Sequence, residues 1–151
     1  MQNIFAGYGK IVTGDLYIHR KALETELCNR TINYETYGSV SVVGMQRMGK
    51  SSLVYNTIVN KSEEYYDKGI VIVNCSMNSF ATPESFFKGI VDAVYETLEE
   101  HDDLDAKIER RYNKVVEASL EEGCVKNIQS FFKLILKSGK RVLCIIDEFD
   151  H

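Results

Sequence analysis

The chain has 151 residues, of which 44% are hydrophobic and 26% are charged, and its formal net charge is −4. This length and composition predict one soluble globular unit, and the negative charge argues against a surface built mainly to bind nucleic acid or anionic lipid. No apolar run approaches the roughly 20 residues of a membrane span, and the amino terminus lacks a signal-peptide pattern. Four separated cysteines without a CxxC pair are typical of reduced thiols, so we expect a cytoplasmic protein.

The first predicted element is a β-strand over residues 39–43 (SVSVV), whose valines are apolar and β-branched. Directly after it comes GMQRMGKS, residues 44–51, which fits the pattern GxxxxGK[ST] without a mismatch. A helical pattern over residues 50–60 follows, with Leu53, Val54 and Ile58 on its inner face. A plain glycine-containing turn is the alternative, but the strand before it and the helix after it favour a phosphate-binding loop.

Each part of such a loop has a chemical role. Glycines let the backbone curl so that successive N–H groups point inward and bind phosphate oxygens at the positive end of the following helix. We expect Lys50 to contact the β and γ phosphates in both binding and catalysis, Ser51 to bind the Mg²⁺ that bridges them, and Ser52 to contact the α phosphate. The predicted nucleotide-binding residues of the loop are Gly44, Met45, Gln46, Arg47, Met48, Gly49, Lys50, Ser51 and Ser52.

Strands and helices alternate further along the chain. Residues 69–74 (GIVIVN) and 142–146 (VLCII) are predicted as buried strands. Between them, Thr82 is expected to cap a helix that begins at Pro83, and residues 101–122 predict a charged, mostly solvated helix. Two apolar stripes mark the better-defined helices: Phe87, Ile90, Val91, Val94, Tyr95 and Leu98, then Ile128, Phe131, Phe132 and Ile135. The alternation predicts an α/β fold with a parallel, three-layer sheet.

The last predicted strand ends in two carboxylates, Asp147 and Glu148. They lie at the carboxyl edge, where open α/β sheets bind ligands, and form a Walker B pattern. Asp147 is expected to support Mg²⁺, and Glu148 to orient and polarise the water that attacks the γ phosphate. Acidic residues after a strand are commonly only a solvated turn, so this interpretation depends on the phosphate loop. Asp150 fits either a turn residue or a partner of this pair.

Two groups of motifs resemble a known family. GMQRMGKSSL and IIDEFD resemble P-loop ATPases of the additional-strand, catalytic-glutamate division, and more narrowly the AAA-like STAND and archaeal-type ATPases. Residues 3–5, 9–12 and 17–23 are similar to that family's NPF, pV and FiGRxxEl patterns. Together, the matches span nearly the whole chain.

The resemblance also implies an adenine-binding segment. Ile18, His19 and Arg20 occupy the positions that pack on the base in the family. The sequence departs from the family at Ile4 and His19, where proline and glycine are usual, and at Gln46, where a basic residue is common. By themselves, His19 and Arg20 also fit an ordinary helix start in solvent.

The resemblance implies a domain organisation and a function as well. A further strand, later in sequence than Asp147, is expected between the loop strand and the acidic strand. Residues 1–38 are then a lead-in, and residues 39–151 an incomplete P-loop NTPase core that would not turn over ATP alone. The implied function is binding of ATP with Mg²⁺ and hydrolysis that drives a conformational switch in a larger protein, with self-association or a partner domain outside this chain. A non-hydrolysing nucleotide-binding module or a protein-interaction module is the alternative.

A GTPase was the remaining possibility. Residues 60–63 (NKSE) are superficially like the guanine-reading NKxD motif, but they end in Glu63 and directly follow the first predicted helix. ATP is therefore favoured over GTP.

Overall fold

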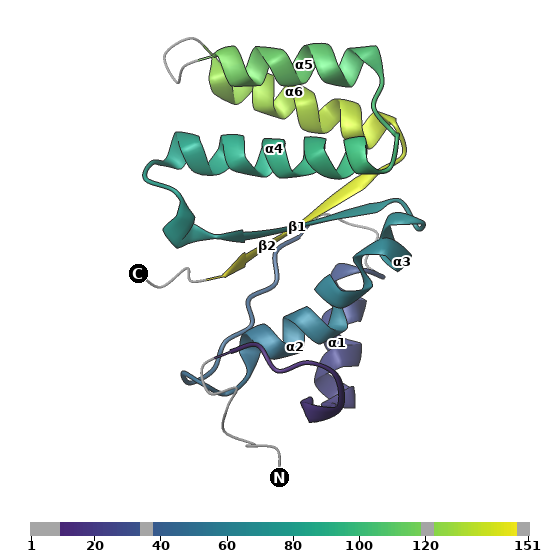
Figure 1. Ribbon diagram of the computed structural model, residues 1–151, viewed down its shortest axis with the longest axis vertical. Helices are drawn as coiled ribbons and strands as arrows, with labels where there is room; N and C mark the ends of the chain where they lie inside the picture. Colours follow the sequence, from purple (N-terminus) through teal and green to yellow (C-terminus); the bar gives the residue numbers. More distant parts are fainter. Residues whose placement is uncertain (1–9, 34–37, 119–122, 148–151) are drawn as a thin grey trace. The chain divides into compact units, whose positions relative to one another are not determined.

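The computed structural model describes residues 10–33, 38–118 and 123–147 (Figure 1). The chain divides into two compact units, Met1–Glu64 and Tyr65–His151. The division falls after the phosphate loop and its helix, so the loop belongs to the first unit and the predicted strands over residues 69–74 and 142–146 belong to the second.

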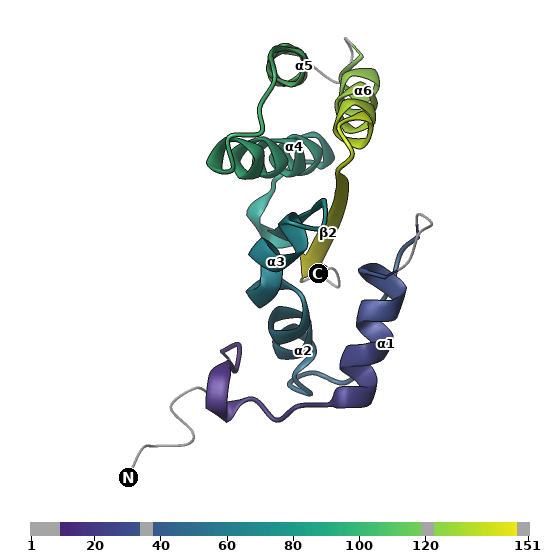
Figure 2. The ribbon, with the colours of Figure 1, turned by 90° about the vertical axis from the view of Figure 1, so that its right-hand side faces the viewer.

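Two helices form the centre of the first unit, and they contact each other (Figure 2). Leu27 of the first helix and Leu53 of the second are buried, as is Ile58, which follows the second helix. The inner face predicted for residues 50–60 is therefore confirmed at Leu53 and Ile58, whereas Val54 is only half-buried. The α-helix ends at Thr57, and a 3-10 turn continues it. In chain order, the elements are η1 (Gly14–Leu16), α1 (Lys21–Thr31), α2 (Lys50–Thr57), η2 (Val59–Lys61) and α3 (Ser62–Tyr66), which leads into the second unit.

The strand predicted over residues 39–43 is not present. The structure describes residues 38–49 without a strand, and Val43 there is 88% exposed. A β-strand needs a neighbour that pairs with its backbone N–H and C=O groups. The two strands that the structure describes pair with each other. β-branched side chains favour an extended backbone but do not supply a partner, so this prediction was wrong.

The second unit contains a parallel pair of strands, β1 (Ile70–Ser76) and β2 (Arg141–Asp147). Their register runs from Ile70 opposite Arg141 to Ser76 opposite Asp147. A left-handed glycine precedes each strand, Gly69 at φ 78° and Gly139 at φ 83°, and the N–H of Arg141 donates to the carbonyl of Gly69 at 2.8 Å. Both strands were predicted within two residues of their ends, but β2, which was predicted to be buried, is half-buried with an exposed carboxyl end.

Three helices complete the second unit: α4 (Pro83–Glu100), α5 (Ala106–Glu117) and α6 (Cys124–Lys137), with the short turn η3 (Met77–Ser79) after β1. Thr82 caps α4 as predicted, because its hydroxyl accepts from the N–H of Ser85 at 3.1 Å and the Ser85 hydroxyl accepts from the N–H of Thr82 at 3.1 Å. The helix predicted over residues 101–122 is shorter in the structure, where α5 spans Ala106–Glu117. It begins later than predicted because the Asp105 carboxylate accepts from the N–H groups of Lys107 and Ile108 and so caps the helix at this point.

The core of the second unit lies between the strands and these helices. Alternate residues of β1 are buried on one face of the sheet, and α4 and α6 contact β1 and β2 respectively (Figure 1). In α4 the stripe begins at Phe86, which is buried, and Phe87 is 51% exposed. The fully enclosed side chains of the core include Val71, Val91, Val94, Leu98, Phe131 and Ile135. The α/β class is therefore confirmed, with a two-stranded parallel sheet where three strands had been predicted.

A polar cluster lies where both strands begin. The Tyr66 hydroxyl donates to Asp103 Oδ2 at 2.5 Å, and Lys140 Nζ lies 3.0 Å from the same oxygen. The His101 ring stacks on Tyr66 at a centroid distance of 3.6 Å. Hydrogen bonds from Tyr66 and then Lys140 hold the pKa of the Asp103 carboxyl below its ordinary value.

The cysteines are free thiols, and Cys75 and Cys124 are buried. On the sheet, Cys144 of β2 lies opposite Val73, two positions from Cys75 of β1. Burial, reinforced by the neighbouring Cys75, raises the pKa of the Cys144 thiol to about 12. None of the described helices has the length and apolar character needed to cross a membrane.

Candidate phosphate-loop site

The loop between residues 44 and 49 turns through two left-handed residues. Arg47 has φ 62° and Gly49 has φ 76°, and the N–H of Met48 donates to the carbonyl of Met45 at 3.4 Å. Gly49 then caps α2, which begins at Lys50. Left-handed residues between right-handed ones turn successive N–H groups to one side of the backbone, which is the geometry of an anion-binding nest.

Lys50 already contacts this loop. Its ammonium donates to the carbonyl of Gly44 at 2.9 Å and to that of Met45 at 3.1 Å. The Lys50 stem also runs close to Gly44, where an added Cβ would lie 3.8 Å from Lys50 Cδ. The cation is therefore held over the start of the loop by neutral carbonyl oxygens, which a phosphate oxygen can replace with a stronger, charge-assisted contact.

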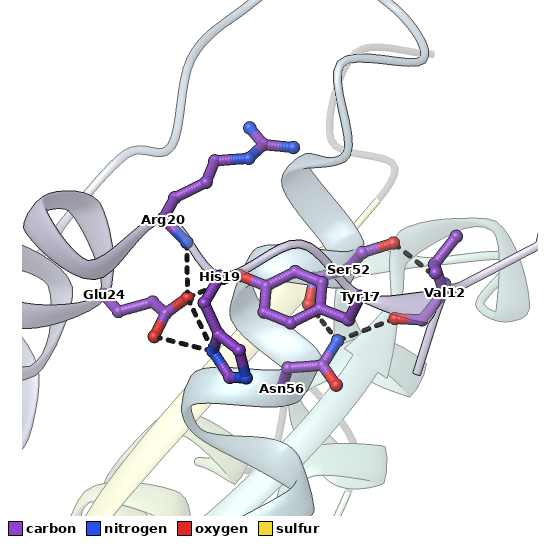
Figure 3. A network of polar contacts seen from close by, with 7 residues as sticks. All are labelled: Val12, Tyr17, His19, Arg20, Glu24, Ser52 and Asn56. Atoms are coloured by element: carbon purple, nitrogen blue, oxygen red, sulfur yellow. Dashed lines mark hydrogen bonds and ion pairs between the residues drawn. The ribbon is translucent and has the colours of Figure 1, made fainter. Parts of the chain in front are cut away.

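The amino-terminal segment lies against the first turns of α2 (Figure 3). The N–H of Val12 donates to Ser52 Oγ at 3.0 Å, and Asn56 Nδ2 donates to the carbonyls of Val12 and Ser52, each at 2.7 Å. Ser52 is 7% exposed. Its hydroxyl oxygen thus anchors the amino-terminal segment, and its contact with an α phosphate stays a prediction.

Glu24 organises the segment predicted to lie beside adenine (Figure 3). Its carboxylate accepts from the N–H of Arg20 at 2.7 Å and from the Tyr17 hydroxyl at 3.1 Å, and it lies 3.2 Å from His19 Nδ1. Burial alone would raise the pKa of the Glu24 carboxyl, but the contacts with Arg20, His19 and Tyr17 together hold it below the ordinary value. Burial and the Glu24 carboxylate raise the pKa of the Tyr17 phenol.

The three predicted adenine-side residues are placed differently. Arg20 reaches the loop, where Nη2 donates to the carbonyl of Met48 at 2.7 Å. His19 turns toward Glu24, and its ring meets that of Tyr17 edge-on. Ile18 is 83% exposed. The structure therefore brings one of the three to the phosphate loop, and the contact of all three with a base stays a prediction.

Two residues of this arrangement, Glu24 and Asn56, were not singled out from the sequence. Glu24 lies four residues after Arg20 in the first turn of α1, and Asn56 lies one helical turn after Ser52. Such spacing is a signal for contact within a helix. Nothing in it indicates that Asn56 also contacts Val12, 44 residues earlier.

The acidic pair belongs to the second unit. Asp147 is the last residue of β2, opposite Ser76, and is exposed. It therefore lies at the carboxyl edge of the parallel pair, as predicted. Glu148 and Asp150 lie outside the described residues, so their predicted roles stay predictions.

Comparison of the chain with known protein families, curated proteins and solved structures found no match. The case for a function therefore depends on the residues and geometry of the loop.

Proposed function

We propose that this chain binds ATP with Mg²⁺ through residues 44–52. The observation that carries the proposal is the loop itself: left-handed Arg47 and Gly49 precede α2, and the Lys50 ammonium lies on the loop carbonyls of Gly44 and Met45. A GxxxxGKS sequence in this backbone geometry would bring backbone N–H donors, a helix amino terminus and a cation together at one place.

The residues present suit a triphosphate. The ligand carries several negative charges, and this part of the loop offers the cations Arg47 and Lys50 without an acidic residue between positions 44 and 52. Lys50 would exchange its two carbonyl contacts for oxygens of the β and γ phosphates. Ser51, the second residue of α2, would offer its hydroxyl to the metal. When bound, Mg²⁺ would supply neutralisation of the charge on the β and γ phosphates.

Hydrolysis is the further part of the proposal, and it depends on the acidic pair. Asp147 at the end of β2 would support the metal, and Glu148 would accept a proton from the attacking water. In a larger protein that resembles the AAA-like and STAND ATPases, hydrolysis would drive a conformational switch, with self-association or a partner domain. A module that binds ATP without hydrolysing it would share the same loop.

Adenine is favoured over guanine. Residues 60–63, which superficially resemble a guanine-reading motif, lie in η2 and α3 directly after α2. In a parallel α/β sheet, ligands are read from loops at the carboxyl ends of strands, so a helical segment in this place does not suit that role.

Calorimetric titration of the chain with Mg-ATP tests the proposal. Lys50→Ala should weaken binding by at least about a hundredfold, because a charge-assisted contact with two phosphates is lost. Lys21→Ala, at an exposed position where α1 begins, is the matched control and should bind like the wild type. Equal affinity of the wild type and Lys50→Ala, or no binding by the wild type, would refute the assignment.

A further inference from the structure

Arg20 contacts the phosphate loop through a backbone carbonyl, that of Met48. Its guanidinium donates to the carbonyl of Met48 at 2.7 Å, and an added Cβ on Gly49 would lie 2.5 Å from Arg20 Nη2. The guanidinium therefore fills the space beside Gly49 that a side chain would occupy. Met48, whose carbonyl accepts this hydrogen bond, lies in sequence between the two left-handed residues of the loop, Arg47 and Gly49.

The contact acts on a specific donor. The carbonyl of Met48 and the N–H of Gly49 belong to one peptide group, so a cation that accepts electron density from that carbonyl makes the N–H a better donor. It also fixes the plane of the peptide, and hence the direction in which the Gly49 N–H points. A hydrogen bond to the Met48 carbonyl thereby prepares the Gly49 N–H of the same peptide group to bind an anion.

Arg20 is held in place from both directions. Its own N–H is bound by Glu24, and its side chain extends away from Glu24 (Figure 3). Earlier in the segment, Val12 is fixed to α2 by Ser52 and Asn56. These contacts restrain the backbone that presents Arg20, so less freedom is lost when the guanidinium engages the loop.

We infer that Arg20 is a positioning residue of the phosphate loop, and that it supports binding of the phosphate chain rather than of the base. This inference rests on the proposed function, because it concerns how the same loop binds a polyphosphate. It assigns a chemical class of ligand to the residue: any Mg-polyphosphate, with or without a nucleoside.

Inorganic tripolyphosphate separates the two roles, because it has the phosphates of ATP and no base. With Mg²⁺ present, Arg20→Ala should weaken binding of tripolyphosphate and of ATP by the same factor, about tenfold, as expected for loss of one exposed charge-assisted hydrogen bond. Arg20→Lys, which keeps the charge and one donor, should restore part of the loss. Lys21→Ala is the matched control. A loss confined to ATP would place Arg20 on the base, and unchanged affinity for both ligands would remove its role; either result overturns the inference.

A second measurement needs no ligand. In hydrogen exchange of the free chain, amides of residues 44–50 should exchange faster in Arg20→Ala than in the wild type, while those of β1 and β2 should be unchanged. If the loop amides of Arg20→Ala exchange at the wild-type rate, the inference is contradicted. If exchange is faster throughout α1 and α2, Arg20→Ala has a general folding defect and not a local effect on the loop, which also contradicts the inference. If the wild type binds neither tripolyphosphate nor ATP, the proposed function fails with it; if the wild type binds both and Arg20→Ala does so equally well, only the inference on Arg20 fails.

Discussion

Substitution of Gly49 by alanine separates backbone strain from the loss of a specific contact. A left-handed alanine costs about 1–2 kcal/mol at any such position. At Gly49 the new Cβ would also lie 2.5 Å from Arg20 Nη2, so the hydrogen bond to Met48 is lost as well. Hydrogen bonds to charged groups contribute about 1.5–3 kcal/mol, and because solvent screens this exposed guanidinium we take a smaller value, about 1 kcal/mol. Gly49→Ala should therefore cost about 2–3 kcal/mol.

Gly14 is the matched control, because it lies in the same unit at φ 59° and an added Cβ would meet nothing within 4 Å. Gly14→Ala should cost only the strain, about 1–2 kcal/mol. The assay is hydrogen exchange of the α2 amides, which reports the free energy of opening this unit. In an Arg20→Ala background, the excess cost of Gly49→Ala over Gly14→Ala should disappear. An excess that persists without Arg20 would show that the guanidinium does not occupy the space beside Gly49.

Three further predictions concern the second unit. Where the protein hydrolyses ATP, Glu148→Gln should bind nucleotide normally but hydrolyse it roughly 100- to 10,000-fold more slowly. Asp147→Asn should slow hydrolysis and also raise the Mg²⁺ concentration needed for tight nucleotide binding. If the two variants behave identically in a Mg²⁺ titration, this division of roles is contradicted. The pKa of Asp103 is lower in the folded chain than its ordinary value of 3.8, so the ionised carboxylate stabilises the fold fully at pH values above 3.8. This stabilisation is lost as the pH falls through the lower pKa of the folded state. Urea unfolding should thus show wild type more stable than Asp103→Asn at pH 7, with a difference that shrinks in acid; a gap independent of pH would argue against an ionic role. With a pKa of about 12, the half-buried Cys144 thiol should resist alkylation at pH 8 in the folded chain and react once the chain is unfolded. Rapid labelling of Cys144 in the native protein would contradict this raised pKa.

The sequence predicted those elements whose signals are local. Thr82 and Pro83 mark the start of α4 through backbone chemistry within one turn, and the β-branched runs of β1 and β2 are long enough to be recognised. The run over residues 39–43 (SVSVV) also has β-branched valines, yet a β-ladder depends on a neighbouring strand that no local pattern shows. Periodicity also failed to separate Phe86 from Phe87, since adjacent residues lie only 100° apart around a helix.

In the candidate site too, local features could be predicted from the sequence and contacts between distant residues could not. The residues of the loop follow from spacing alone, because GxxxxGKS brings glycine, lysine and serine together within eight positions. The contact between Arg20 and Met48 joins residues 28 apart, and that between Val12 and Asn56 joins residues 44 apart. Such contacts depend on how α1 and the amino-terminal segment pack on α2, and packing of this kind is not encoded in a short motif.

Amide NMR of the chain labelled with ¹⁵N only at glycine tests the central claim most directly. The chain has ten glycines, of which Gly44 and Gly49 border the loop, whereas Gly123 and Gly139 lie in the second unit. Saturating Mg-ATP should strongly shift the amide signal of Gly49, because its N–H would donate to a phosphate oxygen, and should shift the signal of Gly44 less. In Lys50→Ala, the same concentration of Mg-ATP should shift neither signal. Glycine signals that do not move with Mg-ATP, or that move equally in Lys50→Ala, would contradict binding of the phosphate chain at this loop.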